Sequence, residues 1–194
     1  MSWYKVAQDE DYKKMKDWFE KRTKKHIELV QKYCEKLVEY DEEKYGELIE
    51  RSEVHDASKF KSPELEPYIY TTWKYKCKED GVDFDCPKEM EDKMNESTEH
   101  HILNNRHHPE FHCDKTENLI NENDRDKPPE EMIDATKMDD VDLAEMICDW
   151  CAVSEERGNT PKSWANKNIG VRWEFTDKQE NFIYELIDEV WKNA

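Results

Sequence analysis

Apolar residues recur along most of the chain at the spacing of an α-helix, and strands with alternating apolar and polar residues are not evident. The longest apolar stripe, at the N-terminal end, predicts one long helix or two abutting helices. The predicted helices cover residues 9–40, 42–57, 62–78, 88–105, 140–157 and 176–192. The pattern therefore predicts an all-α bundle of about six helices.

Residues that start or stop helices support three of these boundaries. Ser62 and Pro63 are typical of a helix start, with Ser62 as N-cap and Pro63 at the first helical position. Asp139 or Asp140 can cap the fifth helix, and Gly158 can end it.

The regions between the helices predict a single domain over residues 1–194 with one irregular excursion. Residues 112–130 are polar and contain two consecutive prolines, which favours a loop. Residues 159–175 include the short run V-R-W-E-F, which predicts a small strand or a loop. Residues 176–194 are expected to be a C-terminal packing helix.

The charge balance excludes some classes of partner. The 194 residues include 48 acidic and 30 basic side chains, giving a formal net charge of −18. Such an acidic chain is not expected to bind long nucleic acids or anionic membranes, because like charges repel. Seven Trp, nine Tyr and six Phe nevertheless indicate a packed core rather than a disordered chain.

No apolar run suits a signal peptide or a spanning helix, so we expect a cytoplasmic protein. The six cysteines are then expected to be reduced thiols. Cys148 and Cys151 form a CxxC pair within a predicted helix, where packing is the simpler interpretation and a redox or metal pair the alternative.

The histidines are the main chemical signal. All seven lie between residues 26 and 112, and four of them form two HH doublets. His26 faces inward on an apolar stripe, either as a core histidine or as a metal ligand. Asp149 lies in an apolar helical segment, where a carboxylate needs a cation, a structural salt bridge or strong donors.

The histidines of the two HH doublets belong to two rows of polar side chains along the helix. The rows are His100, Asn104 and His107, and His101, Asn105 and His108, each at spacing i, i+4, i+7. They predict the lining of a polar cleft, and a solvated, histidine-rich helix end is the alternative.

The order of these residues resembles the HD-domain superfamily of metal-dependent phosphohydrolases, whose signature is H…HD…D on an all-α fold. The matching residues are His26, then His55-Asp56, then Asp149, and His55-Asp56-Ala57-Ser58-Lys59-Phe60 resembles the H-D-x-[GS]-K run of that superfamily. His100–Pro109 resembles the HH-plus-turn segment of its HD-GYP branch but lacks the GYP residues.

Residues 20–165 resemble more closely a family of small bacterial and phage proteins with HDxSKF, HHxxxNxHHPE and EMxxDW motifs. That family carries no firm activity, so the activity has to be inferred from the site.

The resemblance implies a metal site with one or two ions. The implied metal ligands are His26, His55, Asp56, His100, His101 and Asp149. Nitrogen and oxygen ligands of this kind suit Mn, Fe, Co, Ni or Zn. The implied catalytic residues are Asp56, Lys59 and His100, and the implied substrate-binding residues are Lys59, Asn105, Arg106, His107 and His108.

Three functions are consistent with such a site. The first is hydrolysis of a small phosphoester, with a nucleotide as the expected substrate, by a metal-activated water. The second is a di-iron oxygenase on an HD-like scaffold, because the chain has additional histidines. The third is a non-catalytic binding protein stabilised by a metal. The sequence leaves the substrate, the metal and the oligomeric state open.

Overall fold

The computed structural model describes residues 3–121 and 127–191, and describes side chains from residue 10 onward. It is essentially all-α, which confirms the predicted fold class. Contacts group the chain into two compact units. Unit 1 consists of Met1–Lys25 and Asp56–His101, and unit 2 consists of His26–His55 and Ile102–Ala194. The single domain over residues 1–194 stays a prediction.

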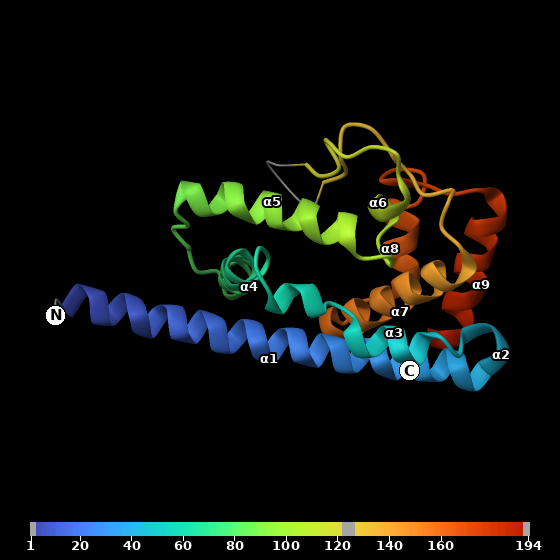
Figure 1. The fold of residues 1–194 in the computed structure, drawn as a ribbon, viewed down its shortest axis with the longest axis horizontal. Helices are drawn as coiled ribbons and strands as arrows, with labels where there is room; N and C mark the ends of the chain where they lie inside the picture. Colours follow the sequence, from blue (N-terminus) through green and yellow to red (C-terminus); the bar gives the residue numbers. More distant parts are fainter. Residues whose placement is uncertain (1–2, 122–126, 192–194) are drawn as a thin grey trace. The chain divides into compact units, whose positions relative to one another are not determined.

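Helices make up most of the described chain (Figure 1). The regular strands among the described residues, β1 and β2, are each two residues long. The elements are α1 (Trp3–Tyr40), α2 (Glu42–Tyr45), α3 (Leu48–Val54), the 3₁₀ helix η1 (Ala57–Phe60), α4 (Leu65–Asp80), α5 (Lys88–Asn104), α6 (Pro109–His112), β1 (Ile133–Asp134), α7 (Asp140–Arg157), α8 (Pro161–Asn168), β2 (Trp173–Glu174) and α9 (Asp177–Trp191).

The predicted boundaries of α7 are confirmed. The Asp139 side chain accepts hydrogen bonds from the backbone N–H groups of Val141 and Asp142, so Asp139 rather than Asp140 is the N-cap. Gly158 ends the helix with φ of +66°, in the left-handed region that glycine adopts without steric cost.

The single helix predicted over residues 42–57 is wrong, because the chain breaks twice there. The Gly46 N–H bonds back to the Glu42 carbonyl and closes α2, and α3 begins only at Leu48. At the second break, His55 leaves the helical region with ψ of 131° and Asp56 takes a left-handed φ of 58°. His55 and Asp56, the HD pair, therefore both lie outside a regular helix.

The predicted helix start at Ser62 is also wrong. Residues 61–64 form a turn in which the N–H groups of Glu64 and Leu65 both bond to the Lys61 carbonyl. Helix α4 therefore begins at Leu65, with Glu64 at its N-cap position.

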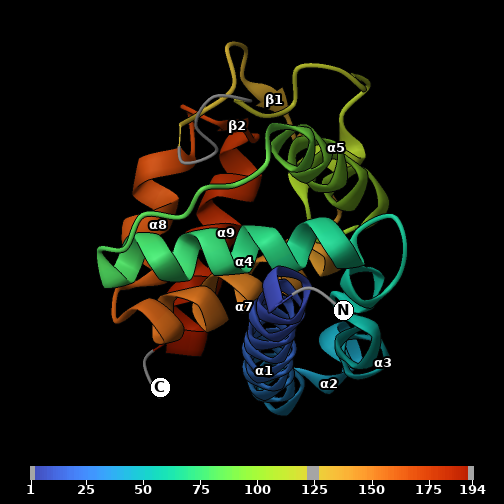
Figure 2. The ribbon, with the colours of Figure 1, turned by 90° about the vertical axis from the view of Figure 1, so that its left-hand side faces the viewer.

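Two short α-helices, α6 and α8, were not predicted, and neither was the 3₁₀ helix η1. Helix α6 begins at Pro109, and helix α8 begins at Pro161 after Thr160, whose side chain caps the Ser163 N–H. Of the two alternatives predicted for V-R-W-E-F, a small strand or a loop, the structure has the strand: β2 pairs in parallel with β1 (Figure 2). Within the predicted 112–130 excursion, residues 122–126 lie outside the described residues, and residues 113–121 and 127–130 contain no helix.

Each unit has its own apolar cluster. In unit 1, Met15 and Phe19 of α1 pack with Tyr68 and Ile69 of α4. In unit 2, α7 packs with α8 and α9, which Figure 1 shows beside it. The apolar face of α9 is buried, as expected for a C-terminal packing helix, and residues 192–194 lie outside the described residues.

All six cysteines are thiols without disulfides, as predicted. Cys34, Cys148 and Cys151 are fully buried in the core of unit 2. Burial raises the pKa of Cys148 and of Cys151, so the CxxC pair has the environment of packed, protonated thiols. Within the described ranges, no helix combines the length and apolar composition needed to cross a membrane.

Candidate functional site

One face of helix α7 carries four acidic side chains in unit 2. Asp142, Glu145, Asp149 and Glu156 follow at offsets of 3, 4 and 7 residues and therefore share a face. The Asp142 side chain is fully buried, and the Glu145 side chain is 6% exposed. Buried carboxylates of this kind require cations or donors around them.

His26 lies on α1 against this face, and its ring is buried as predicted. Its Nε2 atom lies 2.9 Å from Asp149 Oδ1, and its Nδ1 atom lies 3.7 Å from Glu156 Oε2. The requirement for a partner, predicted for Asp149 from its apolar segment, is thus met by an imidazole.

His55 directly follows α3 and faces the same helix. Its Nδ1 atom lies 3.0 Å from Glu145 Oε1, and its Nε2 atom lies 3.9 Å from Asp149 Oδ1. The ring centroids of His26 and His55 are 5.7 Å apart. The Nε2 atoms of both histidines therefore face one oxygen of Asp149.

His107, which the sequence placed among substrate-binding residues, is buried in the same cluster. Its Nδ1 atom lies 3.5 Å from Glu145 Oε1, and its ring centroid lies 4.2 Å from that of His55. His55, His107 and Glu145 can each offer one ligand atom, with all three atoms within 4.8 Å of one another. Two imidazoles and a carboxylate at this spacing can hold a metal ion.

Arg51 fixes the orientation of Glu145. The Arg51 Nε–H donates to Glu145 Oε2 at 2.7 Å, which leaves Oε1 facing His55 and His107. The same guanidinium bonds Asp142 at 2.5 Å, and Arg106 bonds Asp142 at 2.7 Å. The two arginines balance the buried charge of Asp142 and hold the α7 carboxylates in place.

The surroundings of the cluster favour ionised carboxylates and neutral imidazole. Burial raises the pKa of the Glu145 carboxyl, but hydrogen bonds with His107 and His55 outweigh burial and hold that pKa well below its ordinary value. The pKa of Asp149 is also lowered, because its hydrogen bond with His26 outweighs burial. Burial lowers the pKa of His107. These protonation states are the ones in which such groups bind metals.

Unit 1 contains a second arrangement of the same kind. His101 of α5 is buried, with Nε2 3.1 Å from Asp56 Oδ1 and Nδ1 2.9 Å from Glu64 Oε2. Lys59, which the sequence assigned to catalysis and substrate phosphate, lies 2.5 Å from the other oxygen of Asp56. Asp56, His101 and Lys59 are therefore brought together within this unit.

Glu64 is the centre of the polar network in unit 1. Its side chain is fully buried and accepts from Ser58 Oγ at 2.9 Å, while His100 Nδ1 lies 2.7 Å from Oε1. Burial raises the pKa of Glu64, but the hydrogen bond with His101 and the other donors outweigh it and lower that pKa. His100 is 40% exposed, unlike its buried neighbour His101.

The other predicted substrate residues lie between α5 and α6 in unit 2. Arg106 is half-exposed and bonds Asp142, and Asn105 precedes it in the turn after α5. His108 occupies the N-cap position of α6, with its ring centroid 4.2 Å from that of His107.

Glu64, Arg51 and Glu145 were not among the site residues predicted from the sequence. Glu145 lies four residues before Asp149, and this spacing was a usable signal for a shared helix face. Glu64 gave no such signal, because it follows a Ser-Pro pair that is typical of a helix start.

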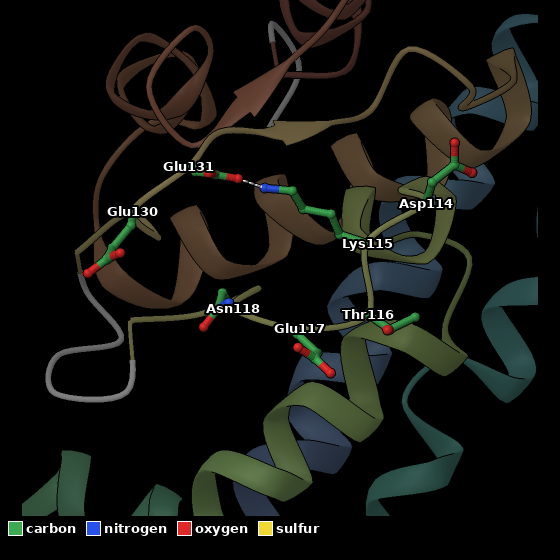
Figure 3. A pocket seen from close by; sticks show the side chains of 7 residues that line it. All are labelled: Asp114, Lys115, Thr116, Glu117, Asn118, Glu130 and Glu131. Carbon is green, nitrogen blue, oxygen red and sulfur yellow. Dashed lines mark hydrogen bonds and ion pairs between the residues drawn. The ribbon is translucent and has the colours of Figure 1, made fainter.

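A separate open pocket of about 380 Å³ in unit 2 contains no histidine. Its lining residues are Asp114, Lys115, Thr116, Glu117, Asn118, Glu130 and Glu131. Figure 3 shows Lys115 reaching across to Glu131, with which it forms an ion pair. The acidic side chains that line this pocket are exposed to solvent and are not joined by a histidine. The candidate functional site is therefore the buried histidine cluster and not this pocket.

A model of one protein family matches residues 15–189, and its description is "Family of unknown function (DUF5662)". The matched range includes every residue of both histidine clusters. Neither the curated proteins nor the solved structures include a match to this chain.

Proposed function

The chain belongs to this family of unknown function, and we propose from its own site that it is a metal-dependent hydrolase of small phosphoesters, with nucleotides as the expected substrates. One observation carries the proposal: His26 and His55 turn their Nε2 atoms toward the same oxygen of Asp149 in a buried cluster. The H…HD…D order of the HD-domain superfamily supports the same chemistry.

The residues of unit 2 fit a divalent transition metal. Imidazole nitrogens and a carboxylate oxygen are borderline ligands that suit Mn, Fe, Co, Ni or Zn. His26, His55 and Asp149 would hold the ion. When bound, such an ion lowers the pKa of a water molecule and stabilises negative charge that develops on a phosphoryl oxygen.

The protein's own groups prepare the site for this role. Glu145 bonds His55 and is itself held by Arg51, which fixes the imidazole ring. The low pKa of Asp149 keeps its carboxylate ionised at neutral pH. The rings of His26, His55 and His107 are buried, which limits the access of bulk water and strengthens electrostatic interactions within the cluster.

Arg106 is the cation in unit 2 that we propose for the substrate phosphate. Its side chain is 52% exposed, and its guanidinium is held by Asp142. A guanidinium is suited to a phosphate because it can donate two parallel hydrogen bonds. In unit 1, Lys59 is the corresponding basic side chain and bonds Asp56. Asp56 and His101 are there a candidate site for a metal ion, separate from the one in unit 2. The net charge of −18 favours small substrates over long polyanions.

The proposal is tested by metal analysis followed by an activity panel. Protein purified without added metal is assayed for bound metals, then loaded with Mn²⁺ or Co²⁺ and offered nucleotides. We expect stoichiometric metal and release of phosphate, both lost in Asp149→Asn and retained in His112→Gln, a histidine outside the proposed ligands. A metal-loaded protein with no turnover across the panel would contradict the hydrolase and support a metal-stabilised binding protein.

A second candidate function is oxygen chemistry at iron. His55, His107 and Glu145 form a two-histidine, one-carboxylate set, the composition used by non-haem iron oxygenases. Near-stoichiometric iron in the purified protein, together with oxygen consumption, would favour this candidate over the hydrolase.

A further inference from the structure

Three buried histidines each lie between a glutamate and an aspartate, and the orientation is the same in all three. The Nδ1 atom faces the glutamate and the Nε2 atom faces the aspartate. The sets are Glu156, His26 and Asp149; Glu145, His55 and Asp149; and Glu64, His101 and Asp56. The third set is in unit 1, so the pattern occurs in each unit separately.

A neutral imidazole has one N–H donor and one nitrogen with a lone pair. Between two carboxylates, the nearer carboxylate is expected to accept the N–H of a neutral ring, and the opposite nitrogen then presents its lone pair. For His55 the distance to Glu145 is 3.0 Å against 3.9 Å to Asp149. For His101 the distance to Glu64 is 2.9 Å against 3.1 Å to Asp56.

His26 has the reverse order of distances, because its Nε2 atom lies 2.9 Å from Asp149 and its Nδ1 atom lies 3.7 Å from Glu156. The glutamate is thus the nearer acceptor for two histidines and the aspartate for the third. His26 can therefore be compared with His55 and His101 as a histidine whose nearer acceptor is the aspartate.

We propose that Glu145 and Glu64 are positioning residues, each of which accepts the Nδ1–H of its histidine and directs the Nε2 lone pair toward an aspartate. Histidines that bind metals commonly donate their other N–H to a carboxylate in this manner. The inference rests on the proposed metal site and identifies the residues that prepare its ligands.

Both glutamates are held by other side chains and cannot turn freely. Arg51 Nε donates to Glu145 Oε2 at 2.7 Å, which leaves Oε1 to face His55. Ser58 donates to Glu64 Oε2, the oxygen that also faces His101, and His100 lies against Oε1. Such fixed acceptors can hold a tautomer before any ion arrives.

The variant Glu145→Gln changes the acceptor into a donor at one atom. Arg51 requires an acceptor, so the carbonyl oxygen of the introduced amide is expected to face the guanidinium and the amide NH₂ group to face His55 Nδ1. His55 would then carry its proton on Nε2 and lose the lone pair toward Asp149. Glu155→Gln is the matched control on the same helix, because Glu155 bonds Lys32 and Tyr33 instead.

The tautomers are read on metal-free protein by long-range ¹H–¹⁵N correlation spectra of the histidine rings. We expect wild-type His55 and His101 as Nδ1–H tautomers, a change to Nε2–H at His55 in Glu145→Gln, and no change in Glu155→Gln. Glu64→Gln is read at His101 in the same way, with the exposed Glu66→Gln as its control. Zn²⁺ affinity, measured by competition with a chelating dye, should fall roughly 10–100-fold in Glu145→Gln.

Wild-type His55 in the Nε2–H form, or with a proton on both ring nitrogens, would overturn the inference even if no variant folded. An unchanged tautomer in a folded Glu145→Gln variant, or an equal loss of Zn²⁺ affinity in Glu155→Gln, would also overturn it. The tautomers are measured without metal or substrate, so they support or contradict the positioning role even if the protein proves to have no hydrolase activity.

Discussion

The guanidinium of Arg51 lies 2.5 Å from the Asp142 carboxylate, whose side chain is fully buried in unit 2. Arg51 is itself only 15% exposed and also bonds Glu145. Burial lowers the pKa of the guanidinium, but these carboxylates outweigh burial and raise that pKa, so the group stays charged. The pair thus places a permanent positive charge beside two acidic groups of α7.

Removing this charge should destabilise the protein strongly. Arg51→Met would leave Glu145 without its closest cation, and breaking a buried ion pair costs about 3–5 kcal/mol. Arg106→Met is the matched comparison, because Arg106 also bonds Asp142 but is 52% exposed, and a half-exposed arginine is expected to contribute about 1 kcal/mol or less. Urea denaturation of both variants measures the difference. An equal decrease in unfolding free energy in the two variants would contradict the larger contribution expected for the buried Arg51.

The N-cap of α7 offers a second stability test. Asp139 accepts two backbone hydrogen bonds, so Asp139→Ala should lose about 1 kcal/mol of unfolding free energy. Asp140→Ala should lose less, because the ion pair of Asp140 with Lys44 is exposed to solvent. Thermal unfolding followed by circular dichroism would reveal a reversed order, which would contradict the assigned cap.

Asp56 tests the cost of a left-handed backbone in the HD pair. Its φ of 58° is unfavourable for alanine by roughly 1–2 kcal/mol but not for glycine. Asp56→Gly and Asp56→Ala both remove the carboxylate that bonds Lys59 and lies 3.1 Å from His101 Nε2, so their difference reports the backbone. We expect Asp56→Gly to be the more stable variant in urea denaturation. At a right-handed helical position the order is normally reversed, and that order here would contradict strain at Asp56.

The sequence predicted the residues that share a helix face and the two ends of α7, but it missed the two breaks within residues 42–57 and the turn at residues 61–64. His26 and Asp149 could be selected because each is a polar group in an apolar helical segment, and both are paired in unit 2. Glu145 and Glu64 are two carboxylates among 48 acidic residues, and only tertiary contacts distinguish them from solvated ones. Residue identity alone did not predict the left-handed Asp56, because aspartate adopts that conformation only occasionally.

Metal binding should stabilise the folded chain. An ion that binds only the folded state at 100 times its Kd adds about 2.7 kcal/mol. Adding Zn²⁺ should therefore raise the melting temperature of the wild type, and the increase should be lost in His55→Gln. The increase should persist in His112→Gln, because His112 is outside the proposed ligand set. If Zn²⁺ raised the melting temperature of His55→Gln as much as that of the wild type, the ion would have to bind without His55.

Glu110 gives a prediction about pH outside the metal cluster. It is buried on α6, and its Oε1 atom accepts a 2.9 Å hydrogen bond from Trp173 Nε1. Burial raises the pKa of Glu110 above its ordinary value, although Trp173 and the charge of Arg172 act in the opposite direction. The folded state therefore holds the Glu110 proton more tightly than the unfolded state does.

A raised carboxyl pKa makes the folded state less stable as pH rises from the unfolded pKa, about 4.3, to the folded one. Each pKa unit corresponds to about 1.4 kcal/mol. Glu110→Gln removes this loss, and the carbonyl oxygen of the introduced amide can still accept from Trp173. Relative to the wild type, Glu110→Gln should gain stability as pH rises from about 4 toward 8 in urea denaturation. A difference that stays constant over this range would mean that Glu110 titrates alike in the folded and unfolded chains.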